Sequence, residues 1–286
     1  MNKVSIIIPI YFGKKYLSDL YRMLNESIQC CLKHFNVYFE IIIINDSPEE
    51  SVIIDKKSSS SNIEVIYIKN DKNRGIHYSR CRGLKASTGN YIVFLDQDDS
   101  IAVEYFYSQL TLIKDNGVVV CNGIDNSFKR KLPIYTSAKA LEMTGNIKSY
   151  ALWNEIISPG QCIIRRDCIP SFWISNIVRT NGADDYFLWV LLLSDNIKFV
   201  FNYEKLYSHN RNYKSTSNNI ALMRNSSLEV NKYLKTYNDK SKDIAIKNER
   251  FVREYFNNTF KILTPSLYKV VFRKILKKYW ELKEHG

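Results

Sequence analysis

Residues 91–99 read YIVFLDQDD, an apolar run that ends in three aspartates within four positions. The first five of these residues predict a strand that is buried on both faces of a sheet. Asp96, Asp98 and Asp99 follow it, and carboxylates this close raise one another's pKa. A divalent cation among them removes that cost, and Mg²⁺ or Mn²⁺ suits such oxygen ligands. A single acid here would favour an N-cap for a helix starting near Ile101, whereas three favour a metal site.

The chain before this segment predicts the sheet to which it belongs. Apolar runs rich in β-branched residues predict strands at 4–10, 39–44 and 63–68, and apolar residues at helical spacing predict helices at 14–33 and 78–86. This alternation is typical of an α/β fold with a parallel sheet and helices on both faces. Ligands bind such sheets at the carboxyl ends of the strands, where Asn45-Asp46 and the three aspartates lie.

The pattern becomes weaker after Ser100. We expect helices at 101–116 and 184–194, and a largely helical, basic chain from about residue 220 to the end. Short strands are expected at 118–121 and 197–201, with a strand edge at 163–164 and irregular chain over 122–160.

Composition excludes several classes of protein. The chain has 286 residues, 45% of them hydrophobic, and a net charge of +12, which implies an anionic partner. No apolar run approaches the roughly 20 residues of a membrane-spanning helix. The N-terminus lacks a signal-peptide pattern, so we expect a cytoplasmic protein. The six cysteines contain no C-x-x-C pair and are expected to be free thiols. P-loop and G-x-G-x-x-G motifs are absent, which argues against P-loop NTPases and dinucleotide oxidoreductases.

Several segments, in their order and spacing, resemble family 2 glycosyltransferases of the GT-A fold. They are VSIIIPIY at 4–11, EIIIIND at 40–46, Asn73-Arg74-Gly75, Arg80, Gly83 and the run from Gly89 to Asp99. The resemblance implies a Rossmann-like nucleotide-binding sheet in a GT-A catalytic domain over residues 1–217. Residues 1–105 would bind the nucleotide sugar and residues 106–217 the acceptor. A basic helical extension would follow at 218–286.

The resemblance also implies a donor site. It assigns nucleotide-sugar binding to Pro9, Tyr11, Asp46, Arg80, Asp96, His209 and Arg211, and metal binding to Asp98, Asp96 and Asp99, with Asp98 first. Two positions depart from the family pattern. Asn45 stands where an acid usually precedes Asp46, and Cys81 stands where an asparagine usually follows Arg80. The usual Tyr-Arg-x-His order around His209 is not kept either.

The family carries its general base in an acid pair before a helix, which here is Asp184-Asp185. Asp185 is favoured, although the resemblance does not separate the two. Acids are also favoured at a helix N-terminus by its dipole alone. On the acceptor side the resemblance points to the loop around Gly160. Trp153 and Trp189 are candidates for stacking on a sugar ring, while the same pattern is common for core residues.

The implied activity is a metal-dependent, inverting hexosyl transfer. The donor would be a nucleotide sugar, UDP-linked, with Mn²⁺ or Mg²⁺ as cofactor. The acceptor would be a glycan hydroxyl, carried on a polyprenyl diphosphate in bacterial surface polysaccharide (O-antigen or capsule) biosynthesis. Apolar residues from Leu267 to Leu282, flanked by lysines, predict a basic amphipathic helix. Such a helix either rests on the inner face of the plasma membrane or packs on the catalytic domain.

Two other functions stay open. A sugar nucleotidyltransferase also uses an α/β sheet and carboxylates, but it usually has a glycine-rich loop with a basic residue, which residues 10–15 match poorly. A nucleic-acid-binding protein fits the charge and the 13% aromatic content. The aspartates at 96–99 would repel phosphates, so we expect no nucleic acid partner.

Overall fold

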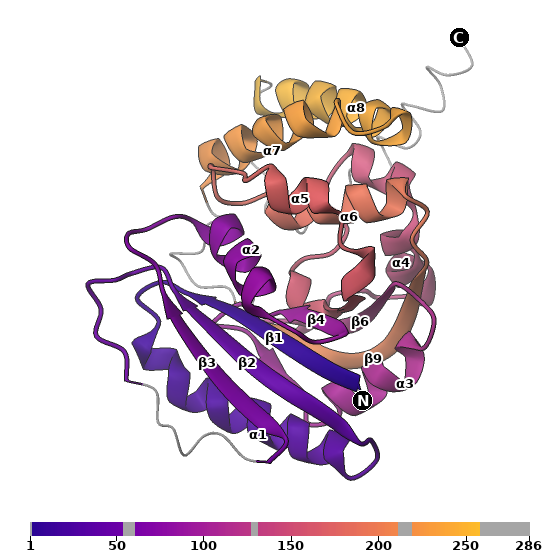
Figure 1. The fold of residues 1–286 in the computed structure, drawn as a ribbon. Helices are drawn as coiled ribbons and strands as arrows, with labels where there is room; N and C mark the ends of the chain where they lie inside the picture. The colour runs from indigo at the N-terminus through magenta and orange to yellow at the C-terminus, as the bar shows by residue number, and fades with distance from the viewer. Residues whose placement is uncertain (1, 54–60, 127–130, 211–218, 258–286) are drawn as a thin grey trace.

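A single mixed sheet runs through the molecule, with helices against both of its faces (Figure 1). The structure is a computed structural model that describes residues 2–53, 61–126, 131–210 and 219–257. In this part of the chain nine strands pair in the order β3-β2-β1-β4-β8-β6-β9-β5, with β7 on β6. The strands are β1 Asn2–Ile10, β2 Val37–Asn45, β3 Ile63–Lys69, β4 Tyr91–Phe94, β5 Ser100–Ile101, β6 Val118–Asp125, β7 Leu132–Pro133, β8 Cys162–Arg165 and β9 Phe199–His209.

The first four strands are parallel, as the alternating pattern predicted. Helix α1 (Leu17–Leu32) connects β1 to β2, and α2 (Ile76–Ala86) leads from β3 into β4. The second half is mixed, because β8 runs antiparallel to both β4 and β6 while β6 and β9 are parallel. The predicted α/β class is therefore confirmed, with antiparallel strands added in the second half.

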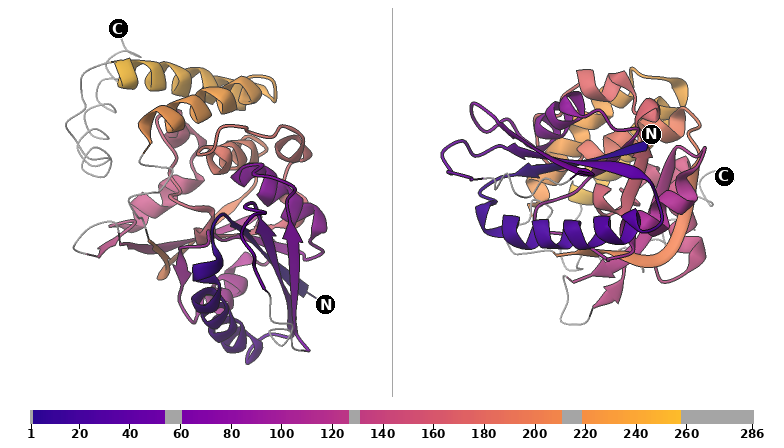
Figure 2. Two further views of the ribbon diagram at one scale, coloured as in Figure 1. Left: turned by 90° about the vertical axis from the view of Figure 1, so that its left-hand side faces the viewer. Right: turned by 60° about the horizontal axis from the view of Figure 1, so that its bottom comes forward.

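Alternate residues of β1 pack on opposite faces of the sheet, which explains why the strand reads as an unbroken apolar run. Ile6 and Ile8 belong to the core that includes α1 and α3 (Tyr105–Ile113). Ile7 belongs to the core on the other face, which includes α2 and α6 (Asp184–Ser194). Figure 2 shows α1 on one side of the sheet and α2 on the other.

The helices α7 (Ile220–Leu234) and α8 (Asp239–Asn257) lie over α5 (Ser171–Ser175) and α6 (Figure 1). Val230, Leu234, Ile244 and Ala245 are buried in the same core as α6. The described part of the expected extension therefore shares the core of the sheet domain. The amphipathic segment expected from Leu267 onward lies outside the described residues. None of the described helices is both long and apolar enough to cross a membrane.

Several bounds differ from the sequence-based expectation. The helix expected from residue 101 begins at Tyr105, because Ser100 and Ile101 pair with β9 instead. The strand expected at 197–201 continues to His209. The segment expected at a strand edge, 163–164, lies inside the sheet between β4 and β6. The chain expected to be irregular contains the short helix α4 (Ala138–Glu142) and several 3₁₀ turns.

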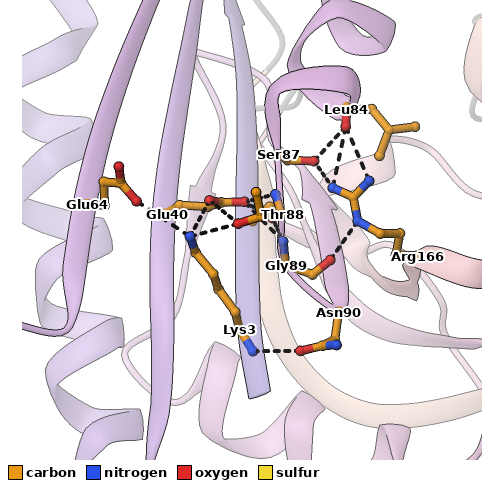
Figure 3. Close-up of polar contacts among 10 residues, drawn as sticks. Lys3, Glu40, Glu64, Leu84, Ser87, Thr88, Gly89, Asn90 and Arg166 are labelled. Atoms are coloured by element: carbon orange, nitrogen blue, oxygen red, sulfur yellow. Dashed lines mark hydrogen bonds and ion pairs between the residues drawn. The ribbon is translucent and has the colours of Figure 1, made fainter. Parts of the chain in front are cut away.

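A buried carboxylate at the amino end of the sheet closes the loop between α2 and β4 (Figure 3). Glu40 of β2 is 1% exposed and lies 2.6 Å from Nζ of Lys3. It also accepts hydrogen bonds from Ser5, from the amide and hydroxyl of Thr88 and from the Gly89 amide. Burial alone would raise the pKa of Glu40, but Lys3, Ser5 and Thr88 together lower it below its ordinary value. The Glu40 carboxylate is thus paired and hydrogen-bonded, and the crowded acids lie at the other end of the sheet.

Candidate functional site

The carboxyl ends of the parallel strands bring the polar segments to one edge of the sheet. The amide of Asp46 donates to the Ile10 carbonyl (2.8 Å), and the amide of Leu95 donates to the Ile7 carbonyl (3.0 Å). The residues that follow β1, β2 and β4 therefore start side by side. Tyr11, Asp46 and Asp96 leave the sheet at this edge, as the ligand-site rule for such folds predicts.

The loop after β1 presents two aromatic rings to solvent. The side chain of Gln97 makes two hydrogen bonds to the backbone of this loop. Oε1 of Gln97 accepts from the Tyr11 amide (2.9 Å), and Nε2 of Gln97 donates to the Tyr11 carbonyl (3.1 Å). Tyr11 is 48% and Phe12 47% exposed, and their rings meet edge to face at 4.7 Å. Pro9 is buried within β1, where it pairs with Ile44 of β2. It therefore belongs to the strand that leads into the loop. Sequence reasoning missed Phe12, although two neighbouring aromatics at a strand end were a usable signal.

Asp46 folds the loop that precedes α2. Its Oδ1 accepts from Asn70 Nδ2 (2.6 Å) and the Arg74 amide (2.8 Å), and its Oδ2 accepts from the Gly75 amide (2.8 Å). Gly75 has φ +88°, a conformation that favours glycine. Asn45, which departs from the family pattern, accepts from the Ser47 amide (2.9 Å) and stabilises the turn after β2. Asp46 is only 5% exposed, so it organises the loop through its hydrogen bonds.

Arg80 joins the aspartate loop to helix α6. Its Nη2 lies 2.5 Å from Oδ1 of Asp96, and its Nη1 lies 2.6 Å from Oδ2 of Asp184. The side chain is 4% exposed, so it is a buried bridge between two carboxylates. The resemblance assigns Arg80 to nucleotide-sugar binding, and in the structure both of its terminal nitrogens bind acids.

Asp99 is buried and anchors the aspartate loop to the end of β9. Its carboxylate accepts from the Tyr207 hydroxyl and from the Asn210 amide (2.8 Å), and Ser158 Oγ lies 3.4 Å away. Nδ1 of His209 is 3.2 Å from Oδ1 of Asp99. Although burial lowers it, the pKa of His209 is raised overall by Asp99. Asp99 and His209 therefore bind each other, and the Asp99 carboxylate faces protein groups.

Asp98 is partly exposed, whereas Asp99 is buried. Burial, followed by the charges of Asp99 and Asp96, raises the pKa of Asp98 to about 6. Within the described residues, no group of three or more His, Cys, Asp and Glu side chains could hold a metal ion. The donor chemistry of Asp98 nevertheless fits Mg²⁺ or Mn²⁺, because such ions take one or two carboxylates and fill their remaining positions with water and substrate phosphates.

Asp185 differs sharply from its neighbour Asp184. Its Oδ2 accepts from Asn154 Nδ2 (2.8 Å) and its Oδ1 from the Tyr186 amide (2.7 Å) at the start of α6. Burial, and then the nearby charge of Asp184, raises the pKa of Asp185 to about 7. Asp184 is 3% exposed and paired with Arg80. A carboxylate that titrates near neutral pH suits a general base, and Asp185 is the member of the pair with these properties.

The residues expected on the acceptor side lie in different surroundings. Trp189 has no exposed surface and packs edge-on against Phe199, so the expectation that a sugar stacks on its ring is wrong. Trp153 is partly exposed and meets the ring of Phe251 edge to face. Gly160 is buried, and a Cβ there would lie 2.7 Å from the Tyr207 ring. Gly160 thus permits close packing beneath the site. Arg211 lies outside the described residues.

Ser158 and Asn154 complete the site and were not assigned a role from the sequence. The Ser158 hydroxyl lies 3.2 Å from Oδ2 of Asp96, and Ser158 also begins a capping box with Gln161. The S-x-x-Q spacing was a readable signal for such a cap. Nothing in the sequence connects Asn154 with Asp185, because the contact depends on how the chain around residue 154 packs against α6.

Comparisons with known proteins show what the chain is similar to. A family model described as glycosyl transferase family 2 matches residues 5–174. An uncharacterized glycosyltransferase of Haemophilus influenzae is 32% identical over 124 residues, 43% of this chain and 47% of that protein. The cholesterol galactosyltransferase of Borreliella burgdorferi is 25% identical over an alignment of 309 residues, gaps included, which covers 99% of this chain and 78% of that protein.

Solved structures share the fold. The crystal structure of S. aureus TarS 1–349 in complex with UDP-GlcNAc has a TM-score of 0.60 at 14% identity, covering 90% of this chain and 73% of that chain. This likeness confirms the predicted α/β fold of GT-A type with C-terminal helices. The chain spans less than half the length of the first curated relatives that it matches.

Proposed function

This chain belongs to glycosyl transferase family 2, and we propose that it moves a hexose from a nucleotide sugar to a hydroxyl of a glycan acceptor with inversion at the anomeric carbon. One observation carries the proposal. A buried arginine, Arg80, joins a carboxylate-rich loop at the sheet edge to the helix that carries Asp185, whose pKa is raised to about 7. This bridge supports a donor site next to a general base.

The donor side rests on Tyr11, Asp46 and the aspartate loop. The exposed rings of Tyr11 and Phe12 offer faces on which a nucleotide base stacks. UDP is the first donor nucleotide to test, because the TarS structure of similar fold holds UDP-GlcNAc. Asp98 is the residue that would hold Mg²⁺ or Mn²⁺, with Asp96 beside it. When bound, such a cation neutralises negative charge on the leaving diphosphate.

Asp185 acts on the acceptor. Its carboxylate takes the proton from the acceptor hydroxyl as that oxygen forms a bond to the anomeric carbon. The bond from that carbon to the diphosphate oxygen breaks, and the nucleoside diphosphate leaves with the electron pair. One displacement inverts the anomeric configuration. Asn154 and the Tyr186 amide hold the carboxylate in a fixed orientation, which favours the reaction by positioning.

The acceptor and the place of action belong to the same proposal. We propose a lipid-linked glycan in bacterial surface polysaccharide assembly, on the cytoplasmic side of the membrane. The full chain has a formal net charge of +12, which suits anionic lipids, and the basic segment expected at 267–282 contributes part of it. The test is sedimentation with anionic vesicles. Full-length protein should sediment and a variant lacking residues 265–286 should not; equal sedimentation of both would refute membrane contact.

The decisive experiment is a donor panel. UDP-glucose, UDP-galactose and UDP-GlcNAc are each incubated with the protein, with Mn²⁺ or with EDTA, and UDP release is followed with and without a glycan acceptor. Metal-dependent release of UDP from one donor supports the proposal. Pyrophosphate release from a sugar phosphate and a nucleoside triphosphate would instead identify a nucleotidyltransferase. Salt-dependent retention of RNA or DNA on a filter, without any UDP release, would identify a nucleic-acid-binding protein.

A further inference from the structure

The segment that leads into α6 has no regular structure, yet side chains from elsewhere hold its backbone at most positions. The Val178 amide donates to Nδ1 of His77 at 2.9 Å. The carboxylate of Glu229 accepts from the amides of Arg179 (2.8 Å) and Thr180 (3.0 Å). Asp184 and Asp185 follow within a few residues, so the path of this segment decides where the base lies.

Helix α7 supplies most of these contacts. Ser226 Oγ accepts from the Ala183 amide at 3.0 Å and donates to the Thr180 carbonyl at 2.6 Å. Glu229 lies one turn further along the same helix. Gly182 has φ +134°, and a Cβ there would meet the sulfur of Met223 at 2.6 Å. Helix α7 thus contacts the segment before α6 near its start, at Arg179, and near its end, at Ala183.

The same segment is tied to the donor side. Oδ1 of Asn181 accepts from the Ile76 amide at 3.1 Å. The preceding residue, Gly75, donates its amide to Asp46. The amides of Gly75 and Ile76 are consecutive at the start of α2. The first donates to Asp46, and the second donates to Asn181 of the segment before α6.

We propose that Glu229 and Ser226 of α7 are positioning residues for the general base. The proposal rests on the proposed function. A carboxylate that accepts hydrogen bonds from two consecutive backbone amides fixes the orientation of both peptide planes. Because the acceptor is charged, both hydrogen bonds are stronger than bonds between neutral groups. The base would then reach its productive position only with α7 in place. The segment matched by the family model ends at residue 174, so these contacts come from the part of the chain beyond it.

Glu229→Gln tests the proposal with little change of shape. The amide replaces one accepting oxygen with an NH₂ donor, which cannot accept from the Arg179 or Thr180 amide. Glu249→Gln is the matched control, because Glu249 lies on the neighbouring helix α8 and binds Lys235 and Arg253. Ser226→Ala is the second variant, because it leaves the Ala183 amide without its acceptor.

Two measurements are compared in the full-length proteins. Hydrogen–deuterium exchange should become faster in the peptide covering residues 178–186 in Glu229→Gln and Ser226→Ala, and stay unchanged there in Glu249→Gln. In the metal-dependent transfer assay, kcat of the first two should fall by roughly tenfold to a hundredfold at an unchanged donor KM, since a small misplacement of a catalytic group has effects of that size. A merely structural role would lower the melting temperature without this split between kcat and KM.

Each other result overturns the inference. Unchanged exchange at 178–186 would show that α7 does not hold the segment. Faster exchange with kcat equal to that of Glu249→Gln would show that the segment does not position the base. Absence of sugar transfer and of donor hydrolysis in the unaltered protein would refute the proposed function itself, and the inference with it.

Discussion

Arg80 and Asp184 form an ion pair in the interior, with Nη1 2.6 Å from Oδ2 and each side chain 4% exposed. Burial disfavours the guanidinium charge, but Asp184 and then Asp96 raise the pKa of Arg80 overall. Since one guanidinium binds two carboxylates, Arg80 couples the helix that carries Asp184 and Asp185 to the loop that carries Asp96 and Asp98.

Replacing Arg80 by methionine should destabilise the protein strongly. Removing one partner of a buried ion pair leaves an uncompensated charge, which costs about 3–5 kcal/mol. The free energy of unfolding is measured by urea titration at pH 7.5. The control is Arg74→Met, because Arg74 pairs with Asp71 in water-exposed surroundings. Equal stability of the two variants would contradict the structural role of Arg80.

Asp185→Asn should abolish most of the transfer activity. Loss of a general base lowers kcat by about 10²–10⁴-fold. In the unaltered protein kcat should rise with pH and level off above about 7, because the carboxylate must be deprotonated to accept a proton and its pKa is raised to about 7. A steady-state pH profile of kcat measures this. A profile that is flat between pH 5.5 and 8 would exclude Asp185 as the base.

The same substitution should stabilise the fold at alkaline pH. An unfolded aspartate titrates near pH 4, with a pKa of about 3.9, whereas the pKa of folded Asp185 is about 7. Because the folded state keeps a proton that the unfolded state has lost, stability falls as pH rises through this window. Asp185→Asn removes the loss, so its urea midpoint should exceed that of the unaltered protein at pH 8, and the difference should become much smaller at pH 4.5. The same difference at both pH values would refute this explanation.

Asp98→Asn should remove a metal-dependent stabilisation. Mn²⁺ together with UDP should raise the melting temperature of the unaltered protein, and EDTA should reverse the rise. A ligand at 100 times its Kd stabilises the folded state by about 2.7 kcal/mol. Asp71→Asn, on an exposed loop residue, is the control and should keep the rise. Retention of the full rise in Asp98→Asn would place the cation elsewhere.

Trp189 and Trp153 should respond differently to substitution. Trp189→Ala removes a fully buried ring and should cost about 3–5 kcal/mol of unfolding free energy. The milder Trp189→Phe should leave the acceptor KM unchanged, because no face of the ring meets solvent. Trp153→Leu should raise the acceptor KM if its partly exposed ring lies against the acceptor. An acceptor KM that rises only in Trp189→Phe would contradict the burial seen here.

Strands buried on both faces were predictable because their composition reflects their environment directly. The runs at 4–10 and 39–44 gave β1 and β2 to within two residues. The burial of Trp189 was also readable, since residues 186–193 are apolar on all sides of the helix and such helices lie in a core. Of the two interpretations that the sequence left open for Trp189, this pattern favours the core residue.

Contacts between residues far apart in the chain could not be predicted from the sequence. Arg80 and Asp184 are 104 positions apart, and Ser158 and Asp96 are 62 apart. Their pairing depends on how α2, α6 and the loop before β8 pack together. The sequence therefore predicted a pair of candidate bases, and only the packing of Arg80 against Asp184 separates their environments.

The anchoring of Asp99 by Asn210 has a consequence for synthesis on the ribosome. The two residues are 111 positions apart, so at about 5–20 residues per second the nascent chain carries Asp99 for roughly 5–20 s before Asn210 is made. Strands β1 to β4 are complete in that interval, whereas the aspartate loop still lacks its anchor at the end of β9. Strands β1 to β4 and the aspartate loop are thus translated well before Asp99 is held in place.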